Sequence, residues 1–571
     1  MTICRLPLNK TPISQNGEID PPLHYKPKPQ NFNMPLKRIP TPTQDAGNWG
    51  TILNDHLSQT QNPLNGAFNS FDQFSARPTN LTLDDVGRTY LYSQTGNWHE
   101  WSGSEWKVQN KSEINVKDYG AIGDGVVDDT AALQLSIDTA SYLSGTYNAS
   151  KTNNVFVPNG KYRVANTLNL TSVVPNARMS FTIEFQTRSD EFAFGTLFIG
   201  ETGDKPVIET TGTSCITLIN VGIKAGVNNP STLGILQARP AGNYGGAFRH
   251  KYSSLFIYLG SNTTANNGFG TIGIINVSGE ECEYESIELW ANTCFITSYT
   301  NGFRISNLDT PTFKSYTAVS AFGIPLTTGE SNTVYKFSGS NRFASFDYVS
   351  PAILINVCAD FNLGTTYISK RDSGTARIGN YSFAVENWNC INFYHRGDIE
   401  GCENYMLLRR ELVQADIAVN MYSIGPISNS AMIQCWDDGA QYSIRDSYIS
   451  IIANITNTSP LIDFRSFTGQ LTSGFSVKNT TFKYSKDYST ASIGASIIDK
   501  SYNSEYLFGD KSIRFLENKQ IRSENSIPII GTYKVGDKVY NTTPSAGGYE
   551  GWLCTTAGTP GTWKGFGLIE S

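Results

Sequence analysis

The feature that most constrains the fold is a short unit that recurs from residue 111 to about residue 520. Each unit is a short strand with apolar residues at alternate positions, a polar corner that often holds Asn or Asp, and a second strand. Examples are CITLINVGIKA (215–225), FRISNLDT (303–310), YSIRDSYISI (442–451) and FSVKNTTFKYS (475–485). Alternation turns the apolar side chains inward, and each coil buries them only against its neighbours. The pattern therefore predicts a β-solenoid whose two ends need caps.

The chain enters this repeat through residues 116–140, VKDYGAIGDGVVDDTAALQLSIDTA, which we call the cap motif. Val116 and residues 119–122 favour a short strand, and the Gly and Asp residues after them favour a turn. Asp128 or Asp129 is placed to cap a helix. That helix carries an apolar stripe at helical spacing, made by Ala132, Leu133, Ile137 and Ala140. We interpret Asp124, Asp128 and Asp129 as structural; the alternative is a catalytic role.

The cap motif and the next strand pair carry a resemblance. DYGAIGDGVVDDTAALQ, followed by VFVPNGKYRV (155–164), resembles the start of the pectate-lyase-like right-handed β-helix superfamily, above all the version found in bacteriophage tailspike proteins. The resemblance implies an all-β, right-handed parallel β-helix whose N-terminal helix covers the open end of the first coil. The resemblance does not identify any catalytic residue in this chain. The five His residues also lack the G-H-G element of plant-type polygalacturonases, which argues against a pectinase.

Composition limits the partners. A net charge of −6 argues against nucleic acid as a partner, because binding phosphate backbones needs a basic surface. Nine scattered Cys residues without a C-x-x-C pair indicate buried thiols made in a reducing cytoplasm, and we expect no metal and no cofactor. The start MTICRLPLNKTP has no apolar core of a signal peptide, and no run is long enough to cross a membrane. We therefore expect no membrane partner.

Three regions follow from these patterns. Residues 1–110 lack the solenoid rhythm: 20–44 is Pro-rich, and 88–108 reads as an antiparallel meander. The helical stripe from Trp49 to Leu57 either seeds a three-chain bundle or docks on its own chain. Residues 111–520 form the β-helix. Residues 521–571 form a small C-terminal β module, which resembles those at the ends of phage tailspikes and tail-fibre enzymes and either closes a trimer or binds sugar.

Glycosidic hydrolysis needs a pair of carboxyl groups, one as acid and the other as base or nucleophile. Residues i and i+2 of a strand project from one face about 7 Å apart, near the lower end of the roughly 6.5–9.5 Å expected for inverting enzymes. In NCINFYHRGDIEGCENY (389–405), we read Ile391, Phe393 and Ile399 as inward, which places Asp398 and Glu400 on the outer face. We place Tyr394, His395 and Arg396 at the preceding corner, where they could stack on a sugar or pair with its carboxylate. We predict Asp398 and Glu400 as the catalytic pair.

Two further clusters are candidates. In EECEYESIELW (280–290), Glu283 and Glu285 form a second possible catalytic pair, and Trp290 is a possible sugar-binding residue. In CWDDG (435–439), consecutive Asp residues suit a turn, and we assign Trp436 and Asp437 to substrate binding. For each cluster the alternative is an ordinary solvated outer face.

A lyase is the competing chemistry. β-Elimination next to a uronic acid needs a base and a cation that neutralises the carboxylate. Tyr394, His395 and Arg396 supply such groups, as does the run Arg249, His250 and Lys251. We favour hydrolysis.

The sequence as a whole predicts a homotrimeric phage or prophage tailspike that binds and depolymerises a bacterial capsular polysaccharide. Its N-terminal region would bind a phage tail, baseplate or adaptor protein. We expect the protein to be made in the host cytoplasm and to act from the virion tail on the outside of the cell. The alternatives are a non-catalytic receptor-binding tail protein and a secreted plant-polysaccharide enzyme.

Overall fold

The structure of the protein is a computed structural model. It describes residues 69–109, 113–144, 153–170, 181–188, 195–238, 247–260, 262, 265, 270–277, 279–298, 303–310, 313–316, 332–338, 341–345, 353–355, 358–370, 383–400, 404–422, 433–435, 442–453, 462–463, 475–484, 501–502, 504–508, 511–516 and 519–571. The chain divides into a small N-terminal unit, which ends at residue 109, and a large unit that contains residues 72–77, 92–97 and 110–571.

The N-terminal unit contains a four-stranded sheet in the order β1(Ser70–Phe71), β2(Thr89–Tyr92), β3(Asn97–Trp101), β4(Trp106–Val108). Strands β3 and β4 pair antiparallel, with Trp101 opposite Trp106. Gly103 has a φ of 99°, so the turn between these strands uses a conformation that favours glycine. The meander predicted over residues 88–108 is therefore present. The predicted helical stripe from Trp49 to Leu57 lies outside the described residues.

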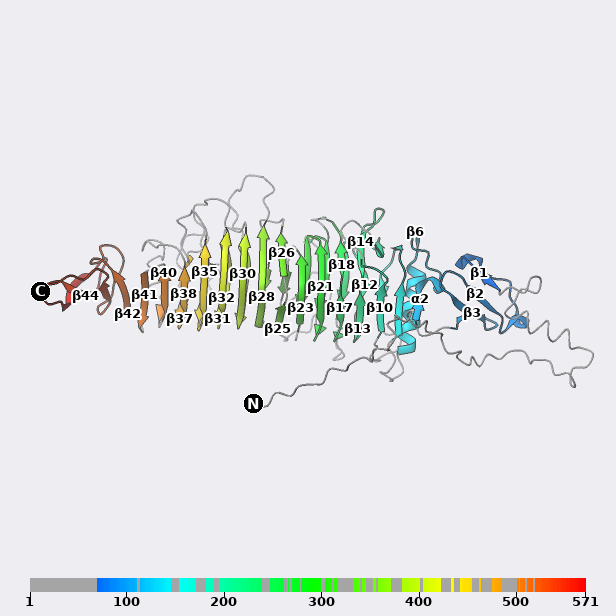
Figure 1. Cartoon of the computed structure of the whole chain (residues 1–571), viewed down its shortest axis with the longest axis horizontal. Helices are drawn as coiled ribbons and strands as arrows, with labels where there is room; N and C mark the ends of the chain where they lie inside the picture. The colour runs from blue at the N-terminus through cyan, green and yellow to red at the C-terminus, as the bar shows by residue number, and fades with distance from the viewer. Residues whose placement is uncertain are drawn as a thin grey trace, which may run out of the picture. The chain divides into compact units, whose positions relative to one another are not determined.

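The large unit is a parallel β-helix of three sheets, which confirms the predicted fold class (Figure 1). Sheet A contains β5(Glu113–Asn115), β7(Asn153–Val157), β10(Phe181–Phe185), β13(Ile216–Ile219), β17(Lys251–Ser253), the first parts of β21(Glu283–Trp290), β23(Phe303–Thr310) and β28(Cys358–Lys370), β25(Asn332–Ser338), the ends of β29(Phe383–Ile391) and β31(Asn404–Val413), β34(Tyr442–Arg445), β37(Phe475–Lys478) and β39(Ser501–Tyr502).

The two other sheets follow it along each coil. Sheet B contains β6(Asp124–Asp128), β8(Lys161–Val164), β11(Leu197–Gly200), β14(Gly222–Ala225), β18(Phe256–Tyr258), the second parts of β21, β23 and β28, β26(Asn341–Ser345), β30(Phe393–Glu400), β32(Asp416–Tyr422), β35(Tyr448–Ala453), β38(Thr481–Tyr484) and β40(Glu505–Phe508). Sheet C contains β9(Leu168–Asn169), β12(Pro206–Glu209), β15(Leu233–Gln237), β19(Ile272–Val277), β22(Thr293–Ser298), β24(Phe313–Tyr316), β27(Ile353–Ile355), the first parts of β29 and β31, β33(Ile433–Cys435) and β36(Ile462–Asp463).

The corner between sheets A and B is the polar corner that the repeat predicts. Its residues have a φ between 47° and 58°; they are Asn220, Ser254, Ser286, Asn307, Asn392, Gln414, Asp446 and Asn479. Asn and Asp tolerate this left-handed conformation better than most residues with a side chain. Several of these corners also donate their backbone N–H to the next coil, as from Asn392 to the Val413 oxygen at 2.9 Å and from Gln414 to the Arg445 oxygen at 3.0 Å. The corners therefore keep successive coils in register.

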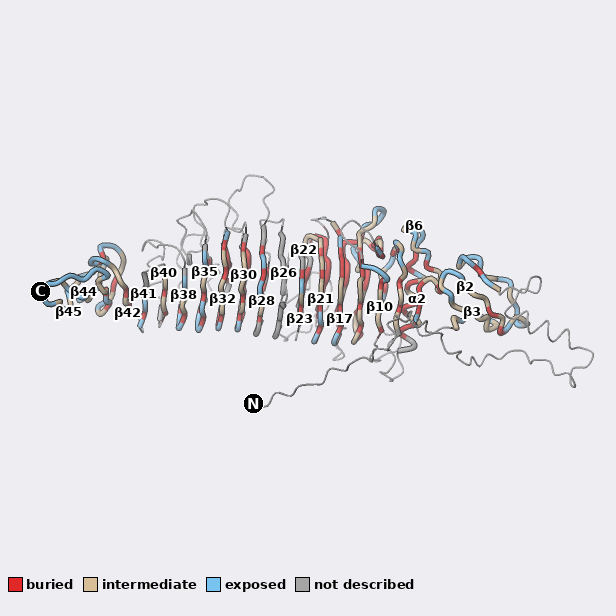
Figure 2. The backbone as a smooth tube through the Cα atoms, viewed as in Figure 1, coloured by how far each residue is buried: buried red, intermediate tan, exposed pale blue. Residues whose placement is uncertain are grey.

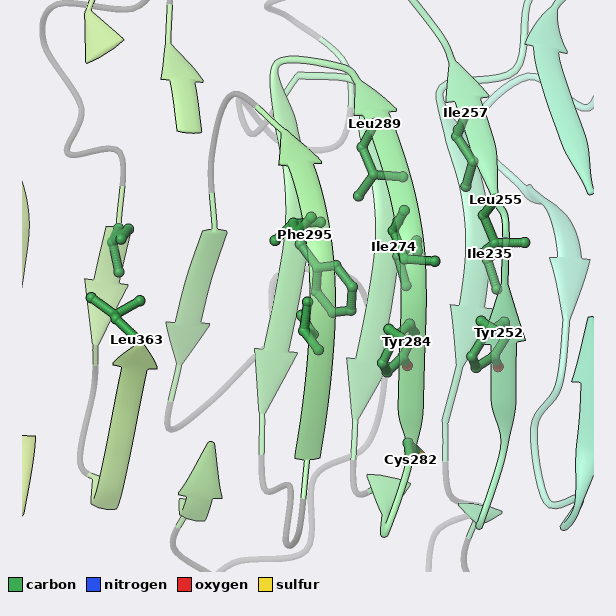
Figure 3. Close-up of a cluster of buried hydrophobic side chains, with 14 of the residues drawn as sticks. Ile235, Tyr252, Leu255, Ile257, Ile274, Cys282, Tyr284, Leu289, Phe295 and Leu363 are labelled. Carbon is green, nitrogen blue, oxygen red and sulfur yellow. The ribbon is translucent and has the colours of Figure 1, made fainter. Parts of the chain in front are cut away.

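Inward side chains form one continuous core along the solenoid. Buried positions recur along the strands in Figure 2, and Figure 3 shows Tyr252 and Tyr284 among the aliphatic core residues. Their rings stack with centroids 4.7 Å apart. Both hydroxyls donate to the buried Oε1 of Gln237, at 2.8 and 3.1 Å. Both phenol hydroxyls therefore have a hydrogen-bond partner inside the core, as buried polar groups generally do.

The helix of the cap motif, α2(Thr130–Ser144), packs its predicted stripe on this core. Leu133, Ile137 and Ala140 are buried members of the core cluster, and Ala132 packs against it. The helix therefore covers apolar side chains of the first coil, as the resemblance implied.

The two predicted capping carboxylates have different roles. Asp128 caps the helix, because its Oδ1 accepts the Thr130 N–H at 3.1 Å. The buried carboxylate of Asp129 holds the preceding turn instead, accepting the N–H groups of Ile122 at 2.6 Å and Gly123 at 3.0 Å. Both roles are structural, in line with our interpretation of the motif.

The predicted strand at Val116 and residues 119–122 is wrong. Residues Val116–Tyr119 form the 3-10 helix η3. It begins because the Asn115 side chain accepts the Lys117 N–H at 3.0 Å, and it ends at Gly120, which has a φ of 102°. The strands lie on either side, as β5 and β6.

At its C-terminal end the solenoid changes from parallel to antiparallel pairing. The change involves β40, β41(Lys511–Leu516) and β42(Lys519–Glu524), and the final module contains β43(Lys538–Asn541), β44(Tyr549–Thr556) and β45(Thr562–Leu568). Trp563 packs edge-on against Tyr533 with centroids 5.0 Å apart, and its Nε1 donates to the Pro560 oxygen at 3.1 Å. This tryptophan therefore stabilises the module from within.

Candidate functional site

The outer face of sheet B gathers tyrosines over four neighbouring strands: β28, β30, β32 and β35. Tyr367 is 37% exposed, Tyr422 is 44% exposed and Tyr448 is 40% exposed. The residues that alternate with them point inward and are buried: Ile368, Ile399, Ile417, Val419, Met421, Ile449 and Ile451. We call the outward positions of these four strands the tyrosine face.

Asp398 lies within the tyrosine face. In the strand register it stands between Tyr367 on β28 and Asn420 on β32. The Asn420 Nδ2 donates to Asp398 Oδ1 at 2.8 Å, so the carboxylate is oriented by a neighbouring coil. This is an outward, half-buried carboxyl group next to an aromatic ring, as a glycosidase acid or base requires.

Glu400 follows on the same strand. Its backbone stands opposite Ser369 and Tyr422, and the strand's period of two predicts that its side chain shares the outward side of β30 with Asp398. Its side chain lies outside the described part of the structure. The pairing of the two carboxyl groups therefore stays a prediction, resting on the strand's period of two.

Arg396 links two further members of the face. Its Nη2 donates to both carboxylate oxygens of Asp416 at 2.8 Å, and its Nε donates to the Tyr394 hydroxyl at 3.1 Å. The bond to Tyr394 and the adjacent Asp416 carboxylate raise the pKa of Arg396. The face therefore presents a charged guanidinium held between a phenol and a carboxylate.

His395 was predicted to contact substrate, and the structure contradicts this. The side chain points inward and is fully buried, with Nδ1 3.0 Å from the Tyr405 hydroxyl. Burial lowers its pKa to about 3.

Ile391 was read as inward but is 42% exposed, because the left-handed corner at Asn392 shifts the alternation between Ile391 and the next strand.

The second predicted pair lies on a different sheet. Glu283 stands between Lys251 and Arg304 on sheet A, and its Oε1 is 3.2 Å from the Arg304 Nη1. Glu285 stands between Ser253 and Ser306 in the same sheet. Exposed carboxylates that alternate with cations are typical of a solvated surface.

Trp290 does not accompany these glutamates. Ser286, with a φ of 56°, forms the corner within β21, so Trp290 belongs to sheet B and pairs with Tyr258. Sequence reasoning treated the strand as one straight element and so grouped residues that the corner separates.

The histidine of the alternative lyase cluster is also buried. His250 accepts the Ile216 N–H through Nδ1 at 3.2 Å, and burial lowers its pKa to about 4. Its neighbour Arg249 pairs with Glu281 at 2.7 Å. A proton-abstracting base in contact with substrate is therefore not available from His250 or His395.

Trp436 and Asp437 lie outside the described residues. Among the residues that the structure describes, no cluster of His, Cys, Asp or Glu has the geometry of a metal site. In the same part of the chain, none of the helices combines the length and apolar character needed to span a bilayer.

Sequence reasoning missed Tyr367, Asp416, Asn420, Tyr422 and Tyr448. A usable signal was present: the second residue after the corners at Asn392, Gln414, Asp446 and Asn479 is Tyr394, Asp416, Tyr448 and Thr481, respectively. Aligning these coils by their corners would have placed Asp416 and Tyr448 in one row with Tyr394.

The start of the solenoid is similar to a known family. Residues 113–239 match the family model described as rhamnogalacturonase A/epimerase, pectate lyase-like. The chain is 49% identical to mannuronan C5-epimerase AlgE1 of Azotobacter vinelandii over 53 residues, which make up 9% of this chain and 3% of the epimerase. The matched segment is only 2% to 8% of the length of the curated relatives.

Comparison with solved structures gives matches that extend along most of the chain. The surface adhesin PfbA of Streptococcus pneumoniae is 13% identical with a TM-score of 0.38, and the match covers 80% of this chain and 98% of PfbA. The tailspike protein of Acinetobacter baumannii phage AM24 is 10% identical with a TM-score of 0.27, with coverage of 73% and 60%.

Proposed function

We propose that this chain is a polysaccharide depolymerase of the phage tailspike type, which binds a bacterial capsular polysaccharide on the tyrosine face and hydrolyses it. The observation that carries the proposal is the position of Asp398 between Tyr367 and Asn420 on an outward face of parallel strands. A sugar ring offers an apolar side of C–H groups for packing on aromatic rings, and hydroxyl groups for amides and carboxylates. The similarity of residues 113–239 to pectate-lyase-like proteins agrees with a polysaccharide ligand.

Asp398 and Glu400 are proposed as the acid and base of the hydrolysis. One carboxyl group gives its proton to the glycosidic oxygen as the bond to the sugar carbon breaks. The other takes a proton from the water that attacks this carbon. Residues two apart on a strand are separated by about 7 Å, which leaves room for that water.

The biological setting is part of the proposal. Residues 1–110 would attach to a phage tail, baseplate or adaptor protein, and residues 521–571 would close a homotrimer or bind sugar. The support is the resemblance of the cap motif to tailspike sequences, together with the modules on both sides of the solenoid. A receptor-binding tail protein without activity is the first alternative.

A lyase is the second candidate, and one observation favours it. The Tyr394 hydroxyl lies 3.1 Å from the Arg396 Nε, which joins a possible base to a cation for a uronate carboxylate. In β-elimination the base removes the proton next to the carboxylate, a C=C bond forms, and the glycosidic oxygen leaves with the bonding electrons. Against this role, Arg396 is already engaged by both oxygens of Asp416.

Product analysis tests the proposal. The purified chain is spotted on lawns of encapsulated strains, and capsule from a cleared strain is then digested. We expect fragments that have each gained one water and that carry no unsaturated uronate. Unsaturated products that absorb in the ultraviolet would identify a lyase, and binding without products would identify a receptor-binding protein. If the protein neither binds nor clears any strain, the proposal is rejected.

A further inference from the structure

A second row of side chains lies on the outer side of sheet B, away from the tyrosine face. Lys224 on β14, Tyr258 on β18 and Trp290 on β21 are successive register partners. The residues next to them in sequence point inward and are buried: Ile223, Ile257 and Leu289. The three side chains therefore project from the same side of the sheet.

The row has the composition of a sugar-binding surface. Tyr258 is 40% exposed, and the Lys224 Nζ lies 5.9 Å from the centre of its ring. The Trp290 Nε1 donates a hydrogen bond to Glu288 Oε1 at 3.0 Å. Glu288 Oε2 accepts a second one from the Arg188 Nη2 at 3.1 Å. These bonds hold the indole in one orientation, so its ring is preorganised for a ligand.

The row is aligned with the tyrosine face. Glu288 on β21 and Asp398 on β30 lie in one row of register partners, which passes through β23, β26 and β28. These are four steps between neighbouring strands, about 19 Å at the usual spacing of about 4.8 Å. Trp290 stands two residues beyond Glu288 on its strand, as Glu400 stands two residues beyond Asp398 on its own. A linear polymer lying across the strands would pass over both places.

We propose that Tyr258, Trp290 and Lys224 form a second carbohydrate subsite, which takes an acidic sugar unit of the same polymer that reaches Asp398. The two rings supply a packing surface for the sugar ring, and the ammonium group supplies a charge partner for a carboxylate substituent. The inference rests on the proposed function, because it takes the polymer cleaved at the tyrosine face as its ligand. Long chains then bind at the tyrosine face and at the second subsite together, whereas short fragments bind at the tyrosine face alone.

The test measures affinity as a function of chain length. The probe is capsular polysaccharide from a strain that the wild-type protein clears, separated into long chains and into fragments too short to span about 19 Å. Trp290→Ala and Tyr258→Ala should each weaken binding of the long chains by about tenfold, the order of one lost stacking contact, and leave the short fragments unaffected. Trp290→Phe should restore most of the loss. Lys224→Met should weaken the long-chain affinity and reduce its dependence on salt.

Leu135→Ala is the matched control, since it removes an exposed apolar side chain from α2. Melting temperatures show whether each variant is folded, and the exposed Tyr258 keeps the test valid if Trp290→Ala unfolds the chain. Wild-type long-chain affinity in folded Tyr258→Ala would overturn the subsite while leaving the proposed function intact. If the wild-type protein clears no strain and binds no capsule, the proposed function fails and the subsite fails with it.

Discussion

The imidazole of His395 stacks on the ring of Tyr405 inside the solenoid, with the two ring centroids 5.8 Å apart and Nδ1 3.0 Å from the phenol oxygen. Among the described residues, Nε2 has no hydrogen-bond partner in its buried position. A charged imidazolium would need partners for both nitrogens. The core therefore holds this histidine neutral, and His250 is held neutral by burial in the same way.

These two histidines predict acid sensitivity. Burial lowers the pKa of His250 to about 4 and that of His395 to about 3, from an ordinary 6.5. Below about pH 6.5 the unfolded chain takes up protons that the folded chain does not, so the free energy of unfolding falls as the pH falls. The slope is on the order of 1.4 kcal/mol per pH unit for each histidine, down to its folded pKa.

Denaturant unfolding from about pH 7.5 to about pH 4.5 measures this slope, which should appear only below about pH 6.5, where the histidines of the unfolded chain take up protons. His395→Phe keeps an aromatic ring against Tyr405 and removes one titrating group. Its stability should therefore vary less steeply with pH than that of the wild type. Identical slopes for the two proteins would show that His395 is not the group that titrates.

Asp398→Asn and Glu400→Gln test the catalytic pair. Each change keeps the shape of the side chain and removes its ionisation, so each variant should fold and bind polysaccharide. Each should lose at least about a hundredfold in the rate of depolymerisation, the lower end of what a positioned acid or base contributes. Release of reducing ends from purified capsule measures the loss.

Glu283→Gln and Glu285→Gln are the matched controls on sheet A and should leave the rate near that of the wild type. Loss of cleavage in these variants alone would place the active groove on the earlier coils. The enzyme is a lyase if three results occur together. Tyr394→Phe abolishes cleavage, the changes in both carboxylate pairs leave cleavage intact, and the products are unsaturated.

Asn420→Ala tests a positioning role. The amide orients Asp398 through the 2.8 Å bond to Oδ1 and is not itself proposed to react. Its loss should lower the maximal rate by less than Asp398→Asn does, with little change in the concentration of polymer that gives half the maximal rate. The pH at which the rate is highest should also shift. A pH profile identical to that of the wild type would show that Asn420 only supports the strand.

Asp129→Ala and Asp128→Ala test the structural interpretation of the cap motif. Loss of Asp129 leaves the N–H groups of Ile122 and Gly123 without their acceptor, at a cost on the order of 1–3 kcal/mol. Loss of the Asp128 cap should cost about 1 kcal/mol. Turnover by the folded variants should stay near the wild-type value; lost turnover at an unchanged melting temperature would make this loop catalytic.

Sedimentation tests the predicted homotrimer. The C-terminal module exposes Ile529 and Ile530, apolar side chains that a neighbouring chain would cover. We expect a trimer at micromolar concentration and weaker association after Ile529→Asp. A wild-type monomer would contradict the trimer, and an unaffected trimer in the variant would move the interface away from this module.

The sequence by itself determined the solenoid, its capping helix and its polar corners, because these depend on local periods and turn chemistry. Alternation along β30 also predicted correctly that Asp398 faces outward. The assignments failed where one corner residue resets the alternation: Asn392 exposes Ile391, and Ser286 separates Glu283 from Trp290. The prediction for His395 failed because the sequence was read as placing it at a corner, whereas it lies within β30 at an inward position.

Only the tertiary structure decided which side chains share a face. Tyr367, Asp398 and Asn420 lie on three different coils, and their juxtaposition depends on the register between parallel strands that are more than twenty residues apart. That register is determined by how each coil packs on the next and by the length of every connection between them. A single sequence contains no local signal for it, since a shift by one residue moves every side chain of a strand to the opposite face.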